Sequence, residues 1–315
     1  YPVYIFLAKL VHRAFASHAA GLAFLSACFG AISLVPLYFL IRLLLIAEPT
    51  PGRGAALVCL LILFNPIVWF NGVRPMSDLT GFFFVTTTQC LLLTSLLDGE
   101  RSWPRRRVLW LLGAGLAGIS IGVRLQAIWL VGPLLLSGMW RLRPLRLATA
   151  LCFTGAVSLW LVPLVSLSGG PTRFVRSFSL LISTALPAEP LLSRFTLQRA
   201  AFGAVDTLVS SWQQVTFGGA ILLLAGIGGI ILARDNRRLL AVVSLLFVPY
   251  AVYHYLLQNT DTLRYTIPVT PLVALLAAVP VLRCARRIPF LIPLAAVGVV
   301  AAATVITLPA LAAYH

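Results

Sequence analysis

The chain of 315 residues is 60% apolar and only 10% charged, and its formal net charge is +16. Soluble domains carry about a quarter charged residues, so this composition excludes a soluble fold. The basic residues stand in short clusters between apolar runs, which is the pattern of membrane topology signals and not of a nucleic-acid-binding surface. We therefore predict one all-α, polytopic transmembrane helical bundle over residues 1–315.

The first half of the chain begins with residues 1–18, which predict an interfacial helix because charged and apolar residues alternate in too short a run to span. Apolar runs at 19–46, 55–70 and 79–97 predict three spans. Two shorter runs, at 108–120 and 127–140, flank Arg124. They fall below the usual length of about 17 residues, which favours either two short, tilted helices or one re-entrant hairpin.

The second half contains further predicted spans at 147–167, 217–232, 239–257, 266–282 and 289–308. This gives about ten crossings. Between the first two of these spans lies the longest polar stretch, 168–214, which we expect to be a large loop holding an amphipathic helix. The chain starts without Met and without a signal-like segment, so we also expect a further segment upstream.

The loops at 42–53, 101–107, 141–146, 234–238 and 283–287 should share one face, because successive spans alternate in direction. Together they hold 15 of the 24 basic residues. The positive-inside rule places these clusters in the cytoplasm, and it places segments 71–78 and 168–214 on the outer side.

Three outer patches contain polar residues that anchoring alone does not require. The first holds Arg74 and Asp78, which suit phosphate binding and proton transfer, although a capped helix start with a snorkelling arginine is the alternative. The second holds Arg124 beside Gln126. A charge between two apolar segments is costly unless it pairs or faces water, so Arg124 is a functional candidate, with a simple interfacial arginine as the alternative.

The third patch holds Asp261, Arg264 and Tyr265. Arg264 suits a lipid phosphate, whereas Tyr265 as an aromatic-belt anchor is the alternative. His254 stands among aromatic residues, and we expect it to be a satisfied interfacial residue. The five cysteines are scattered singly and predict neither a disulfide framework nor a metal site.

Four segments also occur in a familiar order: Pro-x-Tyr within 1–10, Asn65-Pro66 through Asp78, the glycine-rich run from Gly118 to Gln126, and Arg264-Tyr265-x-x-Pro268. Together they resemble the bacterial membrane glycosyltransferases of the GT-C class, which include family 39, the protein O-mannosyltransferases and the aminoarabinose transferases of lipid A. The resemblance covers nearly the whole chain.

The resemblance implies transfer of a sugar from a polyprenyl-phosphate donor to an acceptor on the outer side of the bacterial cytoplasmic membrane. It implies donor-phosphate binding by Arg74, Arg124 and Arg264, with support from Gln126, Tyr265 and Asp261. The family's usual catalytic acid lies in the first outer loop, upstream of this chain, which leaves Asp78 as the best catalytic acid here. Metal dependence differs among family members and stays open.

Two other functions remain possible on the residues alone. A transporter or flippase of a lipid-linked precursor would also need outer arginines, although the chain lacks a convincing internal repeat and an acidic residue in the middle of a predicted span. A non-catalytic scaffold subunit is the third alternative.

Overall fold

The computed structural model describes residues 2–312 except 13, 16, 73, 98–102, 186–190, 192–194, 213, 259 and 261. The described residues form helices and contain no β-strand, which confirms the predicted all-α class. The α-helices up to residue 167 are α1 (Pro2–His12), α2 (His18–Leu44), α3 (Pro51–Leu63), α4 (Pro66–Gly72), α5 (Ser77–Leu97), α6 (Trp103–Val123), α7 (Ile128–Arg141) and α8 (Arg146–Leu167). Those after it are α9 (Pro171–Ala185), α10 (Leu197–Leu208), α11 (Val215–Asp235), α12 (Arg237–Leu257), α13 (Thr270–Ala285) and α14 (Leu291–Ala312). Short 3-10 helices are η1 (Leu125–Ala127), η2 (Arg143–Leu145), η3 (Ser210–Trp212) and η4 (Leu263–Val269).

Seven helical stretches of the described chain are long and apolar enough to cross a membrane: α2, α5, α6, η2 with α8, α11, α12 and η4 with α13. The pair α3 and α4 is an eighth if it counts as one span bent by 64°. The protein is thus a polytopic integral membrane protein. The expected total of about ten would also require α7 and α14, which pack beside α6 and α13 respectively.

The region before Arg124 differs from the short helices or re-entrant hairpin that the apolar runs favoured. Helix α6 has 21 residues because it begins at Trp103, inside the segment 101–107 that we expected to be a loop. Its first turns carry Arg105, Arg106 and Arg107. Long arginine side chains reach toward headgroups from a helix end, so their charge does not end the helix.

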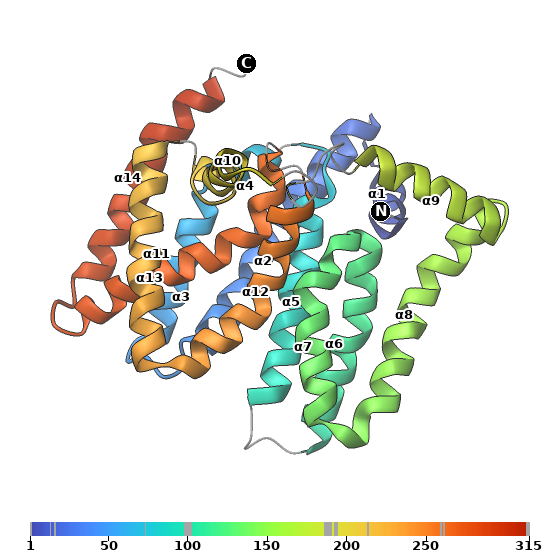
Figure 1. The fold of residues 1–315 in the computed structure, drawn as a ribbon, viewed down its shortest axis with the longest axis horizontal. Helices are drawn as coiled ribbons and strands as arrows, with labels where there is room; N and C mark the ends of the chain where they lie inside the picture. The colour runs from blue at the N-terminus through green and yellow to red at the C-terminus, as the bar shows by residue number, and fades with distance from the viewer. Residues whose placement is uncertain are drawn as a thin grey trace.

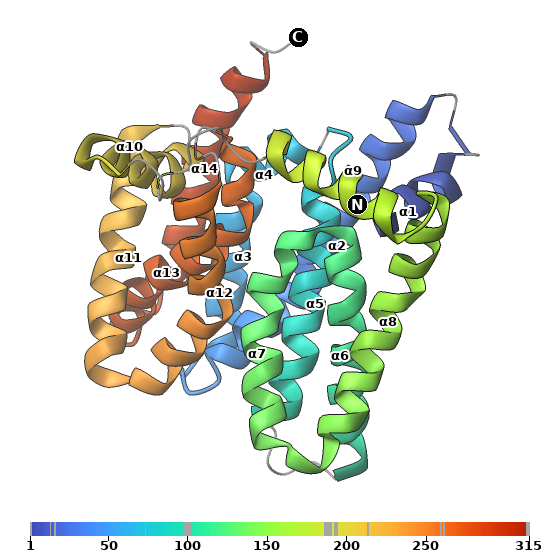
Figure 2. The ribbon, with the colours of Figure 1, turned by 45° about the vertical axis from the view of Figure 1, so that its right-hand side comes forward.

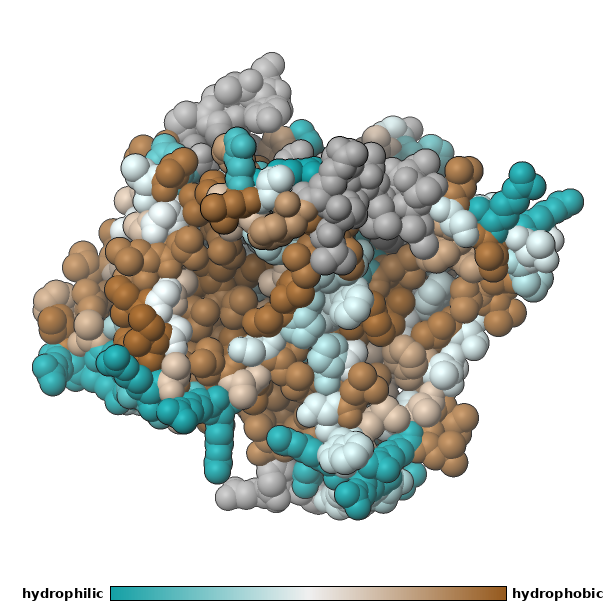
Figure 3. Space-filling model, viewed as in Figure 1, coloured by the Kyte–Doolittle hydropathy of each residue, from teal (hydrophilic) through white to brown (hydrophobic). Residues whose placement is uncertain are grey.

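The two ends of the molecule differ in character. Helices α1, α4, α9 and α10 gather at one end in both ribbon views (Figures 1 and 2). The turns between α7 and α8 and between α11 and α12 lie at the other end, along which hydrophilic side chains collect (Figure 3). We call the first the α9 end and the second the basic end.

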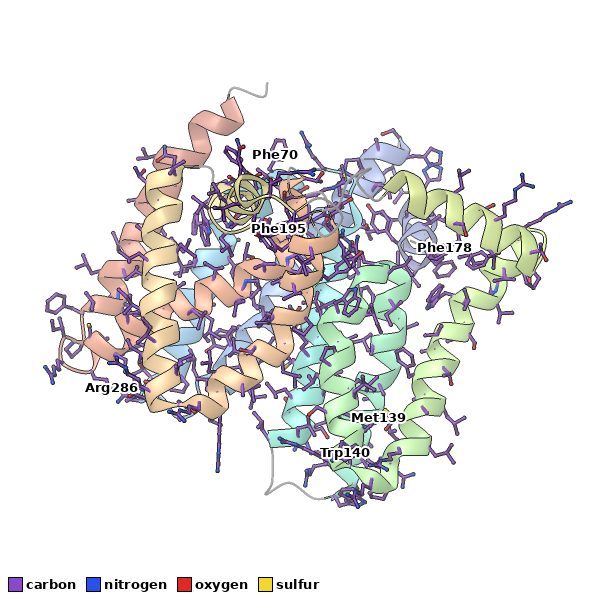
Figure 4. The ribbon with its side chains drawn as sticks, in the orientation of Figure 1. Phe70, Met139, Trp140, Phe178, Phe195 and Arg286 are labelled. Atoms are coloured by element: carbon purple, nitrogen blue, oxygen red, sulfur yellow. The ribbon has the colours of Figure 1, made fainter. Side chains whose placement is uncertain are left out.

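An ion-pair network ties three turns of the basic end together. Glu48, after α2, accepts a hydrogen bond of 2.7 Å from Arg286, and Arg283 lies 3.9 Å from Glu48 and 3.2 Å from Asp235. Figure 4 labels Arg286 at this end and Phe70 at the opposite one. The shared pairs bring the turns after α2, α11 and α13 to one face, as the topology rule requires.

The interior is held by close helix crossings and a few polar ties. The Gln89 amide, fully buried on α5, donates to the carbonyl oxygens of Leu130 on α7 at 3.0 Å and Leu246 on α12 at 3.2 Å. A Cβ atom at Gly228 of α11 would lie 1.9 Å from the Leu276 carbonyl oxygen of α13, so these backbones approach directly. Small residues permit such crossings between membrane helices.

Candidate functional site

Asp78 and Arg124 form an ion pair between the start of α5 and the turn after α6. One Nη1–H of Arg124 donates to Oδ1 of Asp78, and their side chains are only 4% and 7% exposed, Asp78 being the lower. Two charges removed from water require each other, and loss of one partner from such a pair typically costs about 3–5 kcal/mol. The pairing crosses 46 residues of sequence.

Arg124 is held in position by the residues around its own turn. Its backbone is extended, with φ −147° and ψ 120°, which ends α6 and starts η1. Its Nε–H donates to Oε1 of Gln126 at 3.1 Å. Gly81, one turn after Asp78 on α5, leaves the space that the arginine stem fills, because a Cβ there would lie 2.8 Å from Cδ of Arg124.

The Tyr265 ring lies close to both arginines of the site. The guanidinium carbon of Arg124 is 5.5 Å from the centre of the Tyr265 ring, and that of Arg264 is 5.2 Å away. Both distances fall within the range of cation–π attraction. The Tyr250 hydroxyl of α12 donates to the Tyr265 carbonyl oxygen at 2.9 Å, which fixes η4 against α12. One ring therefore interacts with both cations.

The loop before Asp78 is pinned to α2 and to η4. The Ser26 hydroxyl donates to the Met76 carbonyl oxygen at 2.6 Å and accepts from the Met76 N–H at 3.3 Å. Arg264 directs Nη1 at the Met76 sulfur, 2.6 Å away, and Nη2 at the Tyr265 hydroxyl, 3.5 Å away. Segments 188 residues apart thus meet at the site.

The structure joins most of the residues that the sequence pointed to, and Arg74 occupies a different position. Asp78, Arg124, Gln126, Arg264 and Tyr265 form one connected cluster through the contacts above. The Arg74 guanidinium instead lies 3.6 Å from the centre of the Phe70 ring, at the tip of the α9 end (Figure 4). Asp78 pairs with Arg124 and not with its sequence neighbour. Asp261 lies outside the described residues.

Residues that we had given no role complete the cluster. Gly81 and Tyr250 contact or orient site residues directly, as described above. Tyr4 of α1 is 7% exposed, and its buried hydroxyl lies beside Ser26 and near the charge of Asp78. Gly81 was detectable from its place three residues after Asp78, on the same helical face. Tyr250 and Tyr4 stand in apolar segments where aromatic residues are ordinary.

His254 differs from the satisfied interfacial residue that we expected. It is fully buried on α12, with Nδ1 3.1 Å from Oε1 of Gln258. Its ring stacks at 6.3 Å on Tyr250 and meets Tyr265 edge-on at 6.4 Å. Its Nε2 has no hydrogen-bond partner within the described ranges. His254 therefore packs against Tyr250 and Tyr265, the aromatic residues of the cluster.

A narrow cavity lies beside the Asp78–Arg124 ion pair and Tyr250. Its volume is about 10 Å³, roughly the room that one water needs. The lining residues are Asp78, Gly81, Phe82, Val85, Arg124, Gln126, Ala127, Leu130, Tyr250 and Pro268. Among the residues that the structure describes, no three His, Cys, Asp or Glu side chains lie close enough to hold a metal ion. The cluster thus offers the Asp78 carboxylate and the Arg124 guanidinium at the edge of an apolar cavity, and Tyr265 joins Arg264 to Arg124.

Such a cluster can hold an anion and accept a proton. Guanidinium groups present several N–H donors in a plane, which match the oxygens of a phosphate. In surroundings that exclude water, these interactions are stronger than at a solvated surface. A buried carboxylate next to that anion site can take a proton from an incoming hydroxyl or amine.

No protein-family model matches this sequence, and the curated proteins contain no match. The fold is similar to that of the aminoarabinose transferase ArnT from Cupriavidus metallidurans. The apo state of ArnT superposes on this chain with a TM-score of 0.58 at 17% identity. The match covers 89% of this chain and 49% of the ArnT chain. Bound to undecaprenyl phosphate, it gives 0.55 at 15% identity with the same coverage.

The oligosaccharyltransferase of Archaeoglobus fulgidus, crystallised with zinc and sulfate, gives a TM-score of 0.55 at 13% identity, over 96% of this chain and 42% of that chain. Both proteins are GT-C glycosyltransferases. The chain spans about half the length of these proteins, and at such identities the likeness establishes the fold. The fold that the sequence resemblance implied is therefore confirmed.

Proposed function

We propose that this chain carries the donor site of a membrane glycosyltransferase that moves a sugar from a polyprenyl-phosphate donor to an acceptor. The observation that carries the proposal is the buried Asp78–Arg124 pair, with Arg264 beside it, at the end of the molecule away from the basic clusters. The shared fold with ArnT, which binds undecaprenyl phosphate, supports a lipid-phosphate ligand.

In the proposed reaction, the Arg124 and Arg264 guanidinium groups hold the donor phosphate. When the phosphate takes N–H groups of Arg124, the Asp78 carboxylate becomes free to accept the proton of the acceptor's hydroxyl or amine. The acceptor atom bonds to the anomeric carbon and the bond from that carbon to the phosphate oxygen breaks, with inversion. The electron pair of the broken bond leaves with the lipid phosphate, whose negative charge the arginines stabilise.

The membrane in this proposal is the bacterial cytoplasmic membrane, and the site faces its outer side. The positive-inside rule supports that orientation, because the basic residues in the first turns of α6 and in the turns after α2, α7, α11 and α13 lie away from the site. Arg74, half-buried over Phe70 at the α9 end, is proposed to attract the donor headgroup before it reaches the cavity.

The test is transfer from a panel of polyprenyl-phosphate sugars by the full-length protein carrying Asp78→Asn or Arg264→Ala. We expect each change to reduce the transfer rate by about 100-fold or more, the usual contribution of a general base or of a charged transition-state ligand. Asp206→Asn and Arg176→Ala are the matched controls. Asp206, on α10 at the α9 end, accepts a hydrogen bond of 3.1 Å from the Ser210 hydroxyl, and Arg176 is exposed on α9.

Asp78→Asn leaves the buried Arg124 without its counter-charge and can destabilise the fold. The thermal stability of every variant is therefore measured, so that a loss of catalysis can be separated from a loss of folded protein. Arg264 is half-buried, so its removal tests the site without that penalty. Wild-type transfer by a folded Arg264→Ala protein and by a folded Asp78→Asn protein would show that the cluster only anchors the helices. Translocation of the lipid-linked sugar without any transfer would favour a flippase instead.

A further inference from the structure

Tyr4 of α1 brings a hydroxyl group to the ion pair from an element that the proposed reaction does not use. Its ring packs against Leu25 of α2 and Val123 of α6. Each of these residues precedes a member of the site in the chain, Ser26 and Arg124 respectively. Helix α1 therefore places Tyr4 where α2, which carries Ser26, and the end of α6, next to Arg124, pack together.

The Tyr4 hydroxyl has no hydrogen-bond partner among the residues that the structure describes. Ser26 lies beside it, but the Ser26 hydroxyl is already engaged with Met76, because it donates to the carbonyl oxygen and accepts from the N–H of that residue. Burial raises the pKa of Tyr4 above its ordinary value, so the hydroxyl stays protonated at physiological pH. Proteins rarely bury an unpartnered hydroxyl, because it loses its hydrogen bonds to water.

We propose that the Tyr4 hydroxyl binds one hydroxyl group of the sugar that is transferred. The proposal rests on the proposed function. In a polyprenyl-phosphate sugar, the anomeric carbon is bonded directly to a phosphate oxygen, so a phosphate held by Arg124 places the sugar ring next to Arg124. Tyr4 packs on the residue immediately before Arg124 and lies near Asp78. A sugar hydroxyl both donates and accepts, and it can satisfy a phenol and a carboxylate together.

The same arrangement makes Tyr4 a determinant of specificity. A site whose buried polar group needs a partner rejects a substrate that lacks the matching hydroxyl much more strongly than an apolar pocket does. Tyr4 is thus a ligand for the donor sugar and leaves the lipid phosphate to the arginines.

Tyr4→Phe removes only the hydroxyl and keeps the ring that packs on Leu25 and Val123. Loss of an unpartnered hydroxyl should leave thermal stability unchanged or raised, whereas loss of a structural hydrogen bond would lower it. Tyr38→Phe is the matched control. Tyr38 is a half-buried tyrosine near Gly52 of α3, at the opposite end of α2 from Ser26.

The experiment measures equilibrium binding of polyprenyl phosphate and of polyprenyl-phosphate sugars to the full-length protein in lipid nanodiscs. We expect Tyr4→Phe to bind the sugar-bearing lipids about tenfold more weakly than wild type and to bind bare polyprenyl phosphate equally well. A series of donors that each lack one sugar hydroxyl identifies the group that Tyr4 binds. Wild type and Tyr4→Phe should bind equally well only the donor that lacks that hydroxyl.

Equal binding of every donor by Tyr4→Phe and wild type would overturn the inference. An equal loss for bare lipid and sugar-bearing lipid would also overturn it, because the hydroxyl would then act on the phosphate or on the loop at Met76. If the wild-type protein bound neither kind of lipid, the proposed function would fail first, and the inference with it.

Discussion

Gly81 decides whether Arg124 can reach Asp78. The arginine stem crosses α5 at Gly81, and a Cβ atom there would stand 2.8 Å from Cδ and 3.0 Å from Cγ of Arg124. Real Cβ atoms do not approach so closely, so the arginine would have to move. Because Asp78 lies one turn away on the same face of α5, any such movement acts on the ion pair first.

Gly81→Ala should therefore displace Arg124 without removing a charge. We predict a loss of about tenfold or more in donor binding and in transfer, measured on the full-length protein. Gly115→Ala on α6 is the control, because a Cβ there meets nothing within 4 Å. An open alanine in a helix should stabilise by about 0.5–1 kcal/mol. Wild-type activity in Gly81→Ala would mean that the position of Arg124 is unimportant.

The charged members of the site were predictable from the sequence, and their pairing was not. Arg124 and Arg264 stand out because a charge next to apolar segments is costly. Asp78 has a nearer sequence neighbour in Arg74, yet it pairs with Arg124, since the packing of α5 against α6 decides the distance. Tyr4 and Tyr250 gave no such signal, because aromatic residues in apolar runs are common in any membrane protein.

Helix crossings set the spacing between elements, and glycines mark the closest of them. At Gly228 on α11 the carbonyl oxygen of Leu276 on α13 occupies the place of a Cβ atom, whereas next to it Gly229 faces open space. The two adjacent positions therefore separate the effect of packing from that of helix propensity. They also test the α11–α13 crossing, and α13 continues from η4, which carries Arg264 and Tyr265.

Gly228→Ala should push α11 away from α13 and cost about 1–3 kcal/mol, the usual cost of overpacking. Gly229→Ala should be neutral or slightly stabilising. Thermal unfolding of the two variants in the same detergent gives the comparison. Equal melting temperatures would contradict the direct backbone contact that we describe.

Helix bounds were predictable from apolar runs except where charge or geometry intervened. The runs at 19–46 and 79–97 correspond to α2 and α5 within a few residues. The run at 55–70 became two helices, α3 and α4, bent by 64° at Phe64 and Asn65. Asn65 is fully buried there and its Oδ1 accepts from the Ile67 N–H at 2.9 Å, a local bond that competes with helix continuation.

The molecule as a whole is polarised between its basic end and its α9 end. Alternation of span direction and the positive-inside rule predicted that five loops share a face, and ion pairs from Glu48 and Asp235 to Arg283 and Arg286 join three of them. A topology rule of this kind works because it needs only charge counts and span order. The shape of the α9 end depends on how α1, α9 and α10 pack, which charge counts do not contain.

The orientation itself can be tested with a cysteine that the protein already has. Cys284 is exposed, one residue from Arg283 in the basic end, whereas the other four cysteines are only partly exposed. With those four replaced by alanine, a membrane-impermeant maleimide should label Cys284 only after the cells are permeabilised. Thr172→Cys, at an exposed position of α9 in a Cys284→Ala background, should be labelled in intact cells. Labelling of Cys284 in intact cells would invert the proposed topology and move the Asp78–Arg124 site to the cytoplasmic side.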